Sequence, residues 1–189
     1  MSHHLRARGR PFSSVSSEAF RQIAVRSLHL ALWIGALALA FSMVRYTMAA
    51  RLIVPFADEW AFLDWYRGAA EHGVTFDGLW ALDAGHRLLI PRLVFLARDA
   101  WFGGNPLILV VASLLLQAGA IGVIVAVVLR EPCLKGTMLQ TVLAASTIAL
   151  LTWTVQLQNF HWSLQIIYVL AGFLSVAAIA LIAASPPIA

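Results

Sequence analysis

The sequence predicts an all-α integral membrane protein, with about four transmembrane helices and interfacial amphipathic helices in the first extracytoplasmic loop. Of its 189 residues, 61% are hydrophobic and only 12% are charged. The charges are also clustered, because residues 27–44, 100–129 and 136–189 contain no Asp, Glu, Lys or Arg. A helix rises about 1.5 Å per residue and needs about 20 apolar residues to cross a bilayer core. The three stretches therefore hold one, one and two spans, and a soluble or disordered chain is excluded.

The N-terminal part predicts a basic cytoplasmic tail at 1–26 and a first span at 27–44. Five arginines and a single acid precede the apolar run. A secretory signal is the competing interpretation, but its apolar region is usually about 7–15 residues long and precedes a cleavage site with small residues. The run here is longer and is followed by Arg45, which favours an uncleaved anchor.

The next segment, 45–105, is predicted to be an extracytoplasmic loop with amphipathic helices. It holds seven of the nine acids and six of the thirteen basic residues. The order predicted after it is a second span at 106–129, a cytoplasmic turn at 130–136, a third span at 137–155, an extracytoplasmic corner at 156–159, a fourth span at 160–184 and a C-terminal tail at 185–189. Basic residues gather on the cytoplasmic side of membrane proteins. The basic tail and turn therefore predict that both termini are cytoplasmic.

An acidic pair, Asp58 and Glu59, follows the first span closely. Phe56, Trp60 and Leu63 are spaced to share one face of a helix, which would lie in the interface with its aromatic face towards the membrane. Two interpretations of Asp58 stay open. It is the N-cap of this helix, or it is a general base held at the membrane surface, where it would take a proton from an acceptor hydroxyl.

Residues 85–102 form a second amphipathic stretch with a basic character. If the whole stretch is helical, Arg87 and Arg98 share a face and Arg92 points elsewhere. Arginine side chains match phosphate oxygens well. They would either make ordinary headgroup contacts, or His86 and Arg87 would bind the phosphate of a lipid-linked donor and stabilise the leaving group.

A polar stripe marks the start of the fourth span, where Gln158, His161, Gln165 and Tyr168 recur at helical spacing. Such side chains in a bilayer face other helices or a wet cavity. The stripe therefore predicts either interhelical hydrogen bonds or a pocket shared with the 45–105 loop, lined by Gln158, Asn159, His161 and Gln165.

Other chemistry is poorly represented. His72 and His86 could ligate a metal, but no ligand spacing is recognisable, and Cys133 alone cannot build a thiolate site. The sequence therefore identifies no metal. The basic balance is typical of membrane topology and headgroup contacts, so no nucleic-acid partner is expected.

Three motifs stand in order along the chain: Asp58-Glu59, then His86-Arg87 with Pro91-Arg92, then Asn159-Phe160-x-Trp162-x-x-Gln165. Together they resemble the N-terminal part of the bacterial GT-C superfamily of integral membrane glycosyltransferases. The resemblance implies that Asp58 is the catalytic base and that Glu59 is its neighbour or a metal ligand. It also implies that His86, Arg87 and Arg92 contact the donor phosphate.

The same resemblance implies a location in the bacterial inner membrane and, as partners, membrane lipid and a polyprenyl-phosphate-linked sugar. The resemblance does not decide whether a divalent metal is the cofactor. Members of the superfamily have more than four spans, so further spans or a partner chain would be needed to complete an active site. The alternative function is a non-enzymatic membrane accessory or lipid-binding module. A small transporter is disfavoured because no charged residue lies within any span.

Overall fold

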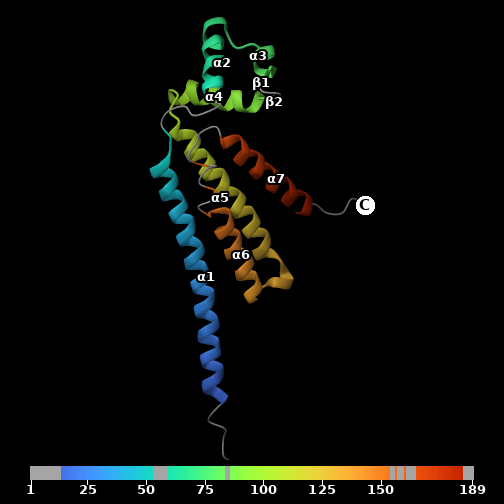
Figure 1. Ribbon diagram of the computed structural model, residues 1–189. Coiled ribbons are helices and arrows are strands. Elements are labelled where there is room, and N and C mark those ends of the chain that lie inside the picture. Colours follow the sequence, from blue (N-terminus) through green and yellow to red (C-terminus); the bar gives the residue numbers. More distant parts are fainter. Residues whose placement is uncertain are drawn as a thin grey trace, which may run out of the picture.

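The computed structural model (Figure 1) describes residues 14–52, 59–83, 86–153, 156, 160 and 165–184. Apart from two short strands, its regular elements are helices. In order they are α1 (Ser14–Ala50), α2 (Glu59–His72), α3 (Phe76–Trp80), β1 (Leu82–Asp83), β2 (His86–Arg87), α4 (Leu89–Phe102), α5 (Leu107–Arg130), the 3-10 turn η1 (Pro132–Leu134), α6 (Met138–Leu151) and α7 (Ile166–Ala184).

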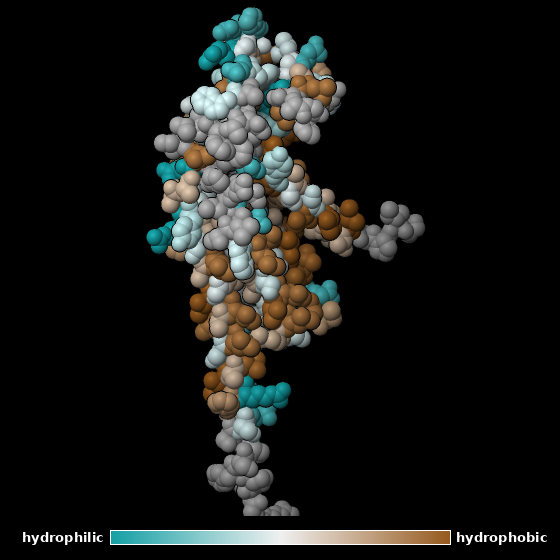
Figure 2. Space-filling view, in the orientation of Figure 1, coloured by the Kyte–Doolittle hydropathy of each residue, from teal (hydrophilic) through white to brown (hydrophobic). Residues whose placement is uncertain are grey.

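Three helices are long and apolar enough to cross a membrane: Ser17–Ala50 within α1, Leu107–Arg130 and Ile166–Ala184. Their large apolar side chains point outwards, as at Phe41, Leu115 and Ile182, which are 66%, 68% and 74% exposed. Figure 2 shows this hydrophobic surface over the helices, with hydrophilic residues at the α2 end. Water would penalise this exposure, whereas lipid would not. The chain is therefore a helical membrane protein.

The first helix is longer than the predicted span. It begins at Ser14 rather than 27 and ends at Ala50 rather than 44, so the described part of the basic segment is helical and not a loose tail. No Pro or Gly interrupts residues 14–34, and arginine and leucine are good helix formers. At 37 residues and about 1.5 Å per residue, α1 is about 56 Å long, well beyond the hydrocarbon core of about 30 Å.

The other long helices differ from prediction in their starts. Helix α5 lies within one residue of the second predicted span at both ends. Helix α7 begins at Ile166 instead of 160. Of the predicted polar stripe, Tyr168 lies in α7 and Gln165 directly precedes this helix, while Gln158 and His161 lie outside the described residues.

The third predicted span, 137–155, is represented by a shorter apolar helix. Helix α6 has 14 residues, which corresponds to about 21 Å and falls short of a bilayer core of about 30 Å. Its start is well capped, since Thr137 Oγ1 accepts a hydrogen bond from Gln140 N at 3.2 Å. Gln140 in turn accepts from Gly136 N and donates to the carbonyls of Val128 and Leu129 at the end of α5.

The bundle is held by two kinds of contact. Helix α1 packs against α6, and α5 packs against both α6 and α7. A buried cluster of Ala36, Ala145 and Ile148 joins α1 to α6, and Thr141 Oγ1 lies 2.9 Å from His29 Nδ1 across the same interface. Small side chains and interhelical hydrogen bonds are typical of helix packing in membranes.

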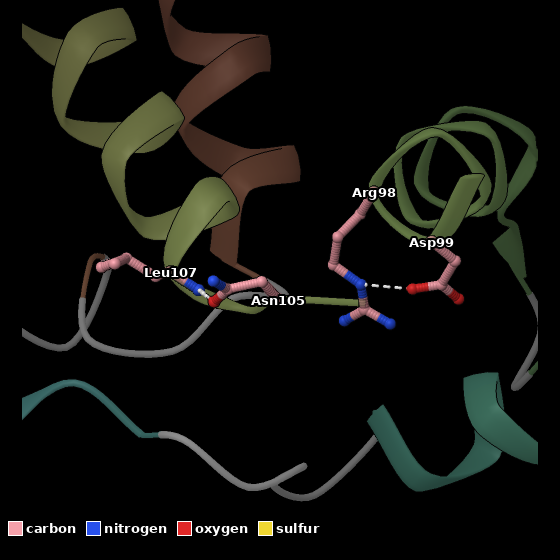
Figure 3. Close-up of polar contacts among 4 residues, drawn as sticks. All are labelled: Arg98, Asp99, Asn105 and Leu107. Atoms are coloured by element: carbon pink, nitrogen blue, oxygen red, sulfur yellow. Dashed lines mark hydrogen bonds and ion pairs between the residues drawn. The ribbon is translucent and has the colours of Figure 1, made fainter. Parts of the chain in front are cut away.

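The segment from α2 to α4, with its β1–β2 hairpin, lies at one end of the bundle (Figure 1). This is the end at which α1 finishes and α5 and α7 begin. A residue in left-handed conformation ends α4: Gly103 has φ +60°, and its N–H bonds to Arg98 O. Asn105 then accepts from Leu107 N at 3.0 Å as α5 starts (Figure 3).

Candidate membrane-surface site

The acidic pair lies at the start of α2. Glu59 is the first residue of that helix, while Asp58 and the side chain of Glu59 lie outside what the structure describes. Both the capping and the catalytic interpretation of Asp58 therefore stay predictions. The aromatic face of α2 is better defined, because Phe62 is buried and Trp60 is 59% exposed. The face packed against protein thus contains Phe62, Trp65 and Tyr66, leaving Trp60 outwards.

A hydrophobic cluster joins this part of the chain to the bundle. Phe62 of α2, Phe95 of α4, Leu109 of α5 and Ile166 of α7 are buried together, and the Phe62 and Phe95 ring centroids are 4.3 Å apart. We call these four residues the surface cluster. Glu59, Arg92 and Gln165 are close in sequence to three of its members. The helices that contain Glu59 and Arg92 and the helix that follows Gln165 therefore meet at one end of the bundle.

The basic motif is not helical at its start. His86 and Arg87 form β2 and pair with β1, so His86 lies opposite Asp83 and Arg87 opposite Leu82. Helix α4 begins only at Leu89. Arg87 and Arg98 therefore do not share a helix face, because the backbone pairing of the hairpin replaces the first turn that the spacing predicted. The side chains of His86 and Arg87 lie outside the described part of the chain.

Arg92 is buried, with 4% of its surface exposed. Its Nη1 donates to the backbone carbonyls of Leu79 and Ala81 at 3.1 and 2.7 Å, and its guanidinium lies 5.1 Å from the Trp65 ring. These contacts tie the end of α3 to α4 and α2, which is a structural role. A contact of Arg92 with donor phosphate stays a prediction.

A second buried arginine, Arg98, which the spacing had paired with Arg87 but whose burial it did not predict, lies nearly two turns further along α4. Arg98 and Asp99 have side chains 9% and 10% exposed, and Arg98 Nε bonds Asp99 Oδ1 at 2.7 Å (Figure 3). The guanidinium lies 4.7 Å from the ring centroid of Phe95. Arg98 therefore rests on the surface cluster.

The polar corner is only partly described. Gln158, Asn159 and His161 lie outside the described residues, and Gln165 is half-buried next to Ile166 of the surface cluster. Phe160, between the undescribed residues, is buried against Met43 of α1. The corner thus adjoins α1, and the pocket lined by Gln158, Asn159, His161 and Gln165 stays a prediction.

One amide within a span has a clear role that the pattern of charges could not reveal. Gln117 Nε2 donates to Leu151 O at 2.8 Å, at the end of α6. Gln117 is ten residues into α5. The C-terminal end of α6 therefore lies beside α5 at a point about 15 Å along its axis from its first residue. A carbonyl left unpaired at that depth is costly. The signal available from sequence was that Gln117 is the single amide in its span.

Beside Gln117 lies a cavity of ≈ 360 Å³. It is bounded by α1, α5 and the end of α6, and its lining is apolar except for Gln117 and Thr152. A second cavity, of ≈ 340 Å³, lies between α2 and α3 and is lined by Asp64, His72 and Thr75 together with glycines. The first suits an apolar chain and the second a small polar group.

Metal and thiol chemistry have little basis in the part of the chain that is described. No group of three or more His, Cys, Asp or Glu side chains there could hold a metal ion, and His72 Nδ1 lies 3.1 Å from Gly68 O. Cys133 is exposed in the turn after α5, and its hydrogen bond to Glu131 raises the pKa of the thiol, with smaller contributions from burial and from the Glu131 charge. The thiol is therefore a poor nucleophile at neutral pH.

Comparison of the chain with protein family models, curated proteins and solved structures finds no match.

Proposed function

We propose that the chain is a GT-C-like membrane glycosyltransferase, or the N-terminal part of one, that moves a sugar from a polyprenyl-phosphate donor to an extracytoplasmic acceptor. The observation that carries the proposal is the surface cluster. Phe62 and Phe95 belong to the helices that contain Glu59 and Arg92, and Ile166 directly follows Gln165. Residues that must act on one substrate need to be close together.

In the proposed reaction, Asp58 takes the proton of an acceptor hydroxyl as its oxygen attacks the sugar carbon bound to phosphate. The carbon–oxygen bond to the phosphate breaks, and the phosphate leaves with the bonding electrons. His86 and Arg87 would stabilise the charge that develops on the leaving group. The apolar cavity beside Gln117 would accommodate part of an isoprenoid chain.

The proposed topology has four crossings, with both termini in the cytoplasm of a bacterium. Gln140 at the start of α6 bonds to the end of α5, whereas Ile166 at the start of α7 contacts Leu109 near the start of α5. The starts of α6 and α7 thus lie near opposite ends of α5, which supports a crossing between them. We assign the third crossing to α6 together with the residues that follow it.

A transfer assay on the full chain in membranes, supplied with a lipid-linked sugar, tests this proposal. Asp58→Asn should reduce transfer by about 10²–10⁴-fold, the usual effect of removing a general base, and Glu59→Gln should also reduce it. Glu71→Gln is the matched control, since Glu71 is an exposed acid on the same helix. If Asp58→Asn and Glu59→Gln both left transfer unchanged, the catalytic assignment would be wrong.

The second candidate is a non-enzymatic lipid-binding or accessory module. One observation favours it: Arg92, one of the three predicted phosphate contacts, uses Nη1 to bind two backbone carbonyls. This function predicts that the acidic substitutions change neither transfer nor the association of the chain with lipid.

A further inference from the structure

Arg98 is a buried charge whose hydrogen bonding is incomplete. Its side chain is 9% exposed, and its contacts are the Nε bond to Asp99 and the stacking on Phe95. Among the described residues, no hydrogen-bond acceptor is found for Nη1 or Nη2. Buried charges are normally paired and fully hydrogen-bonded, because an unsatisfied charged donor is expensive. The outer end of this guanidinium therefore requires an acceptor.

The geometry identifies the kind of acceptor. Asp99 binds Nε, and the Phe95 ring lies against the guanidinium, so the orientation of the group is constrained from two sides. In Figure 3 the two Nη atoms lie at the end of the side chain away from α4. Two adjacent N–H donors in one plane match two oxygens of a phosphate group. We infer that Arg98 binds a phosphate-class oxyanion through Nη1 and Nη2, with Asp99 as a positioning residue.

The location indicates where such an anion would come from. Phe95 packs with Leu109, the third residue of an apolar helix long enough to cross the membrane. Arg98 therefore lies near the level at which a bilayer presents its phosphate groups. A lipid headgroup and free phosphate share this chemistry. The inference does not depend on sugar transfer, since it concerns binding alone.

Arg92 provides an internal comparison. Both arginines are on α4 and buried, and each lies on an aromatic ring. Arg92 Nη1, however, donates hydrogen bonds to two backbone carbonyls. Arg98 donates from Nε alone, to its neighbour Asp99. Of the two, Arg98 is the arginine equipped to receive a ligand.

The test measures the melting temperature of the full chain in neutral detergent. The additives are inorganic phosphate, phosphatidic acid and, as a lipid with the same tails and no phosphate, diacylglycerol; sodium chloride at equal ionic strength controls for screening. A ligand that binds only the folded chain raises its melting temperature. We expect phosphatidic acid or phosphate to raise it in the unaltered chain, and diacylglycerol to have no effect.

Arg98→Gln should abolish this rise, with an apparent affinity lower by about tenfold or more, because one charge-assisted hydrogen bond corresponds to at least that factor. Arg67→Gln is the matched control, as it removes an exposed arginine from α2 and should respond like the unaltered chain. Arg98→Lys keeps the charge and the aliphatic stem but loses the planar fork, so its affinity should fall between those of the other two. It also serves as the informative variant if Arg98→Gln does not fold.

A rise with phosphate as well as with phosphatidic acid would identify a free anion as sufficient, and a rise with phosphatidic acid alone would identify a lipid headgroup. Either result supports the site. The inference is overturned if neither additive stabilises the unaltered chain, or if Arg98→Lys and every folded Arg98→Gln sample respond as the unaltered chain does.

Discussion

The packing of α5 against α7 can be tested at a single methyl group. A Cβ added at Gly119 would lie 2.9 Å from Cε2 of Phe173, too close for an undisturbed contact, whereas a Cβ at Gly122 would meet nothing within 4 Å. Both glycines belong to α5. Gly119→Ala should therefore destabilise the chain relative to Gly122→Ala.

The difference between these two variants isolates the packing effect. Replacing a helical glycine by alanine stabilises by about 0.5–1 kcal/mol through the backbone, and this gain is common to both sites. Overpacking costs about 1–3 kcal/mol, and it applies only at Gly119. The two variants should therefore differ by about 1–3 kcal/mol, with Gly119→Ala the less stable.

Thermal unfolding in detergent measures this difference, at about 2–4 °C per kcal/mol for a chain of this size. Phe173→Leu provides the rescue, because a smaller side chain should remove most of the penalty in the Gly119→Ala background while costing stability in the parent. Equal melting temperatures for Gly119→Ala and Gly122→Ala would refute the close contact between Gly119 and Phe173.

Three further outcomes are expected. Gln140→Ala should destabilise the chain by about 1–2 kcal/mol, because Gly136 N and two carbonyls at the end of α5 lose their partner. Thermal unfolding measures this loss, and Gln22→Ala, on the exposed part of α1, is the control. Gly68→Ala should stabilise α2 by about 0.5–1 kcal/mol, since its Cβ would meet nothing within 4 Å; a loss of stability would contradict the described surroundings of Gly68. For Cys133, the Glu131 contact raises the pKa and so lowers the thiolate fraction at a given pH. Glu131→Gln should therefore speed maleimide labelling and shift its pH profile to lower pH, and an unchanged profile would exclude the contact.

The transmembrane character was predictable because it depends on composition over long windows. The predicted span 106–129, within a charge-free stretch, lies within one residue of α5 at each end, since a buried or lipid-facing helix must be apolar all round. The extension of α1 back to Ser14 was missed because charged residues mark the edge of the membrane, not the end of a helix.

The details of the site depended on tertiary contacts that periodicity does not encode. Arg87 lies in a strand because the chain turns back on Leu82, and no spacing of apolar residues signals so short a hairpin. The burial of Arg92 and Arg98 follows from aromatic residues on other turns and helices. The end of α6 is likewise fixed by an amide on α5, far away in sequence.

The length of α1 has a mechanical consequence. An unbroken helix of 37 residues is a stiff rod that projects about 25 Å beyond a hydrocarbon core of about 30 Å. Its N-terminal end, which carries Arg21 and Arg26, and its C-terminal residue Ala50 must rotate and translate together, because hydrogen bonds between successive turns restrict twisting of the helix. A protein or headgroup that grips Arg21 or Arg26 would thus move the opposite end, eight residues before Asp58 in the chain. In the proposed topology, α1 would therefore transmit a displacement from the cytoplasmic side to the residues that precede Asp58 on the other side of the membrane.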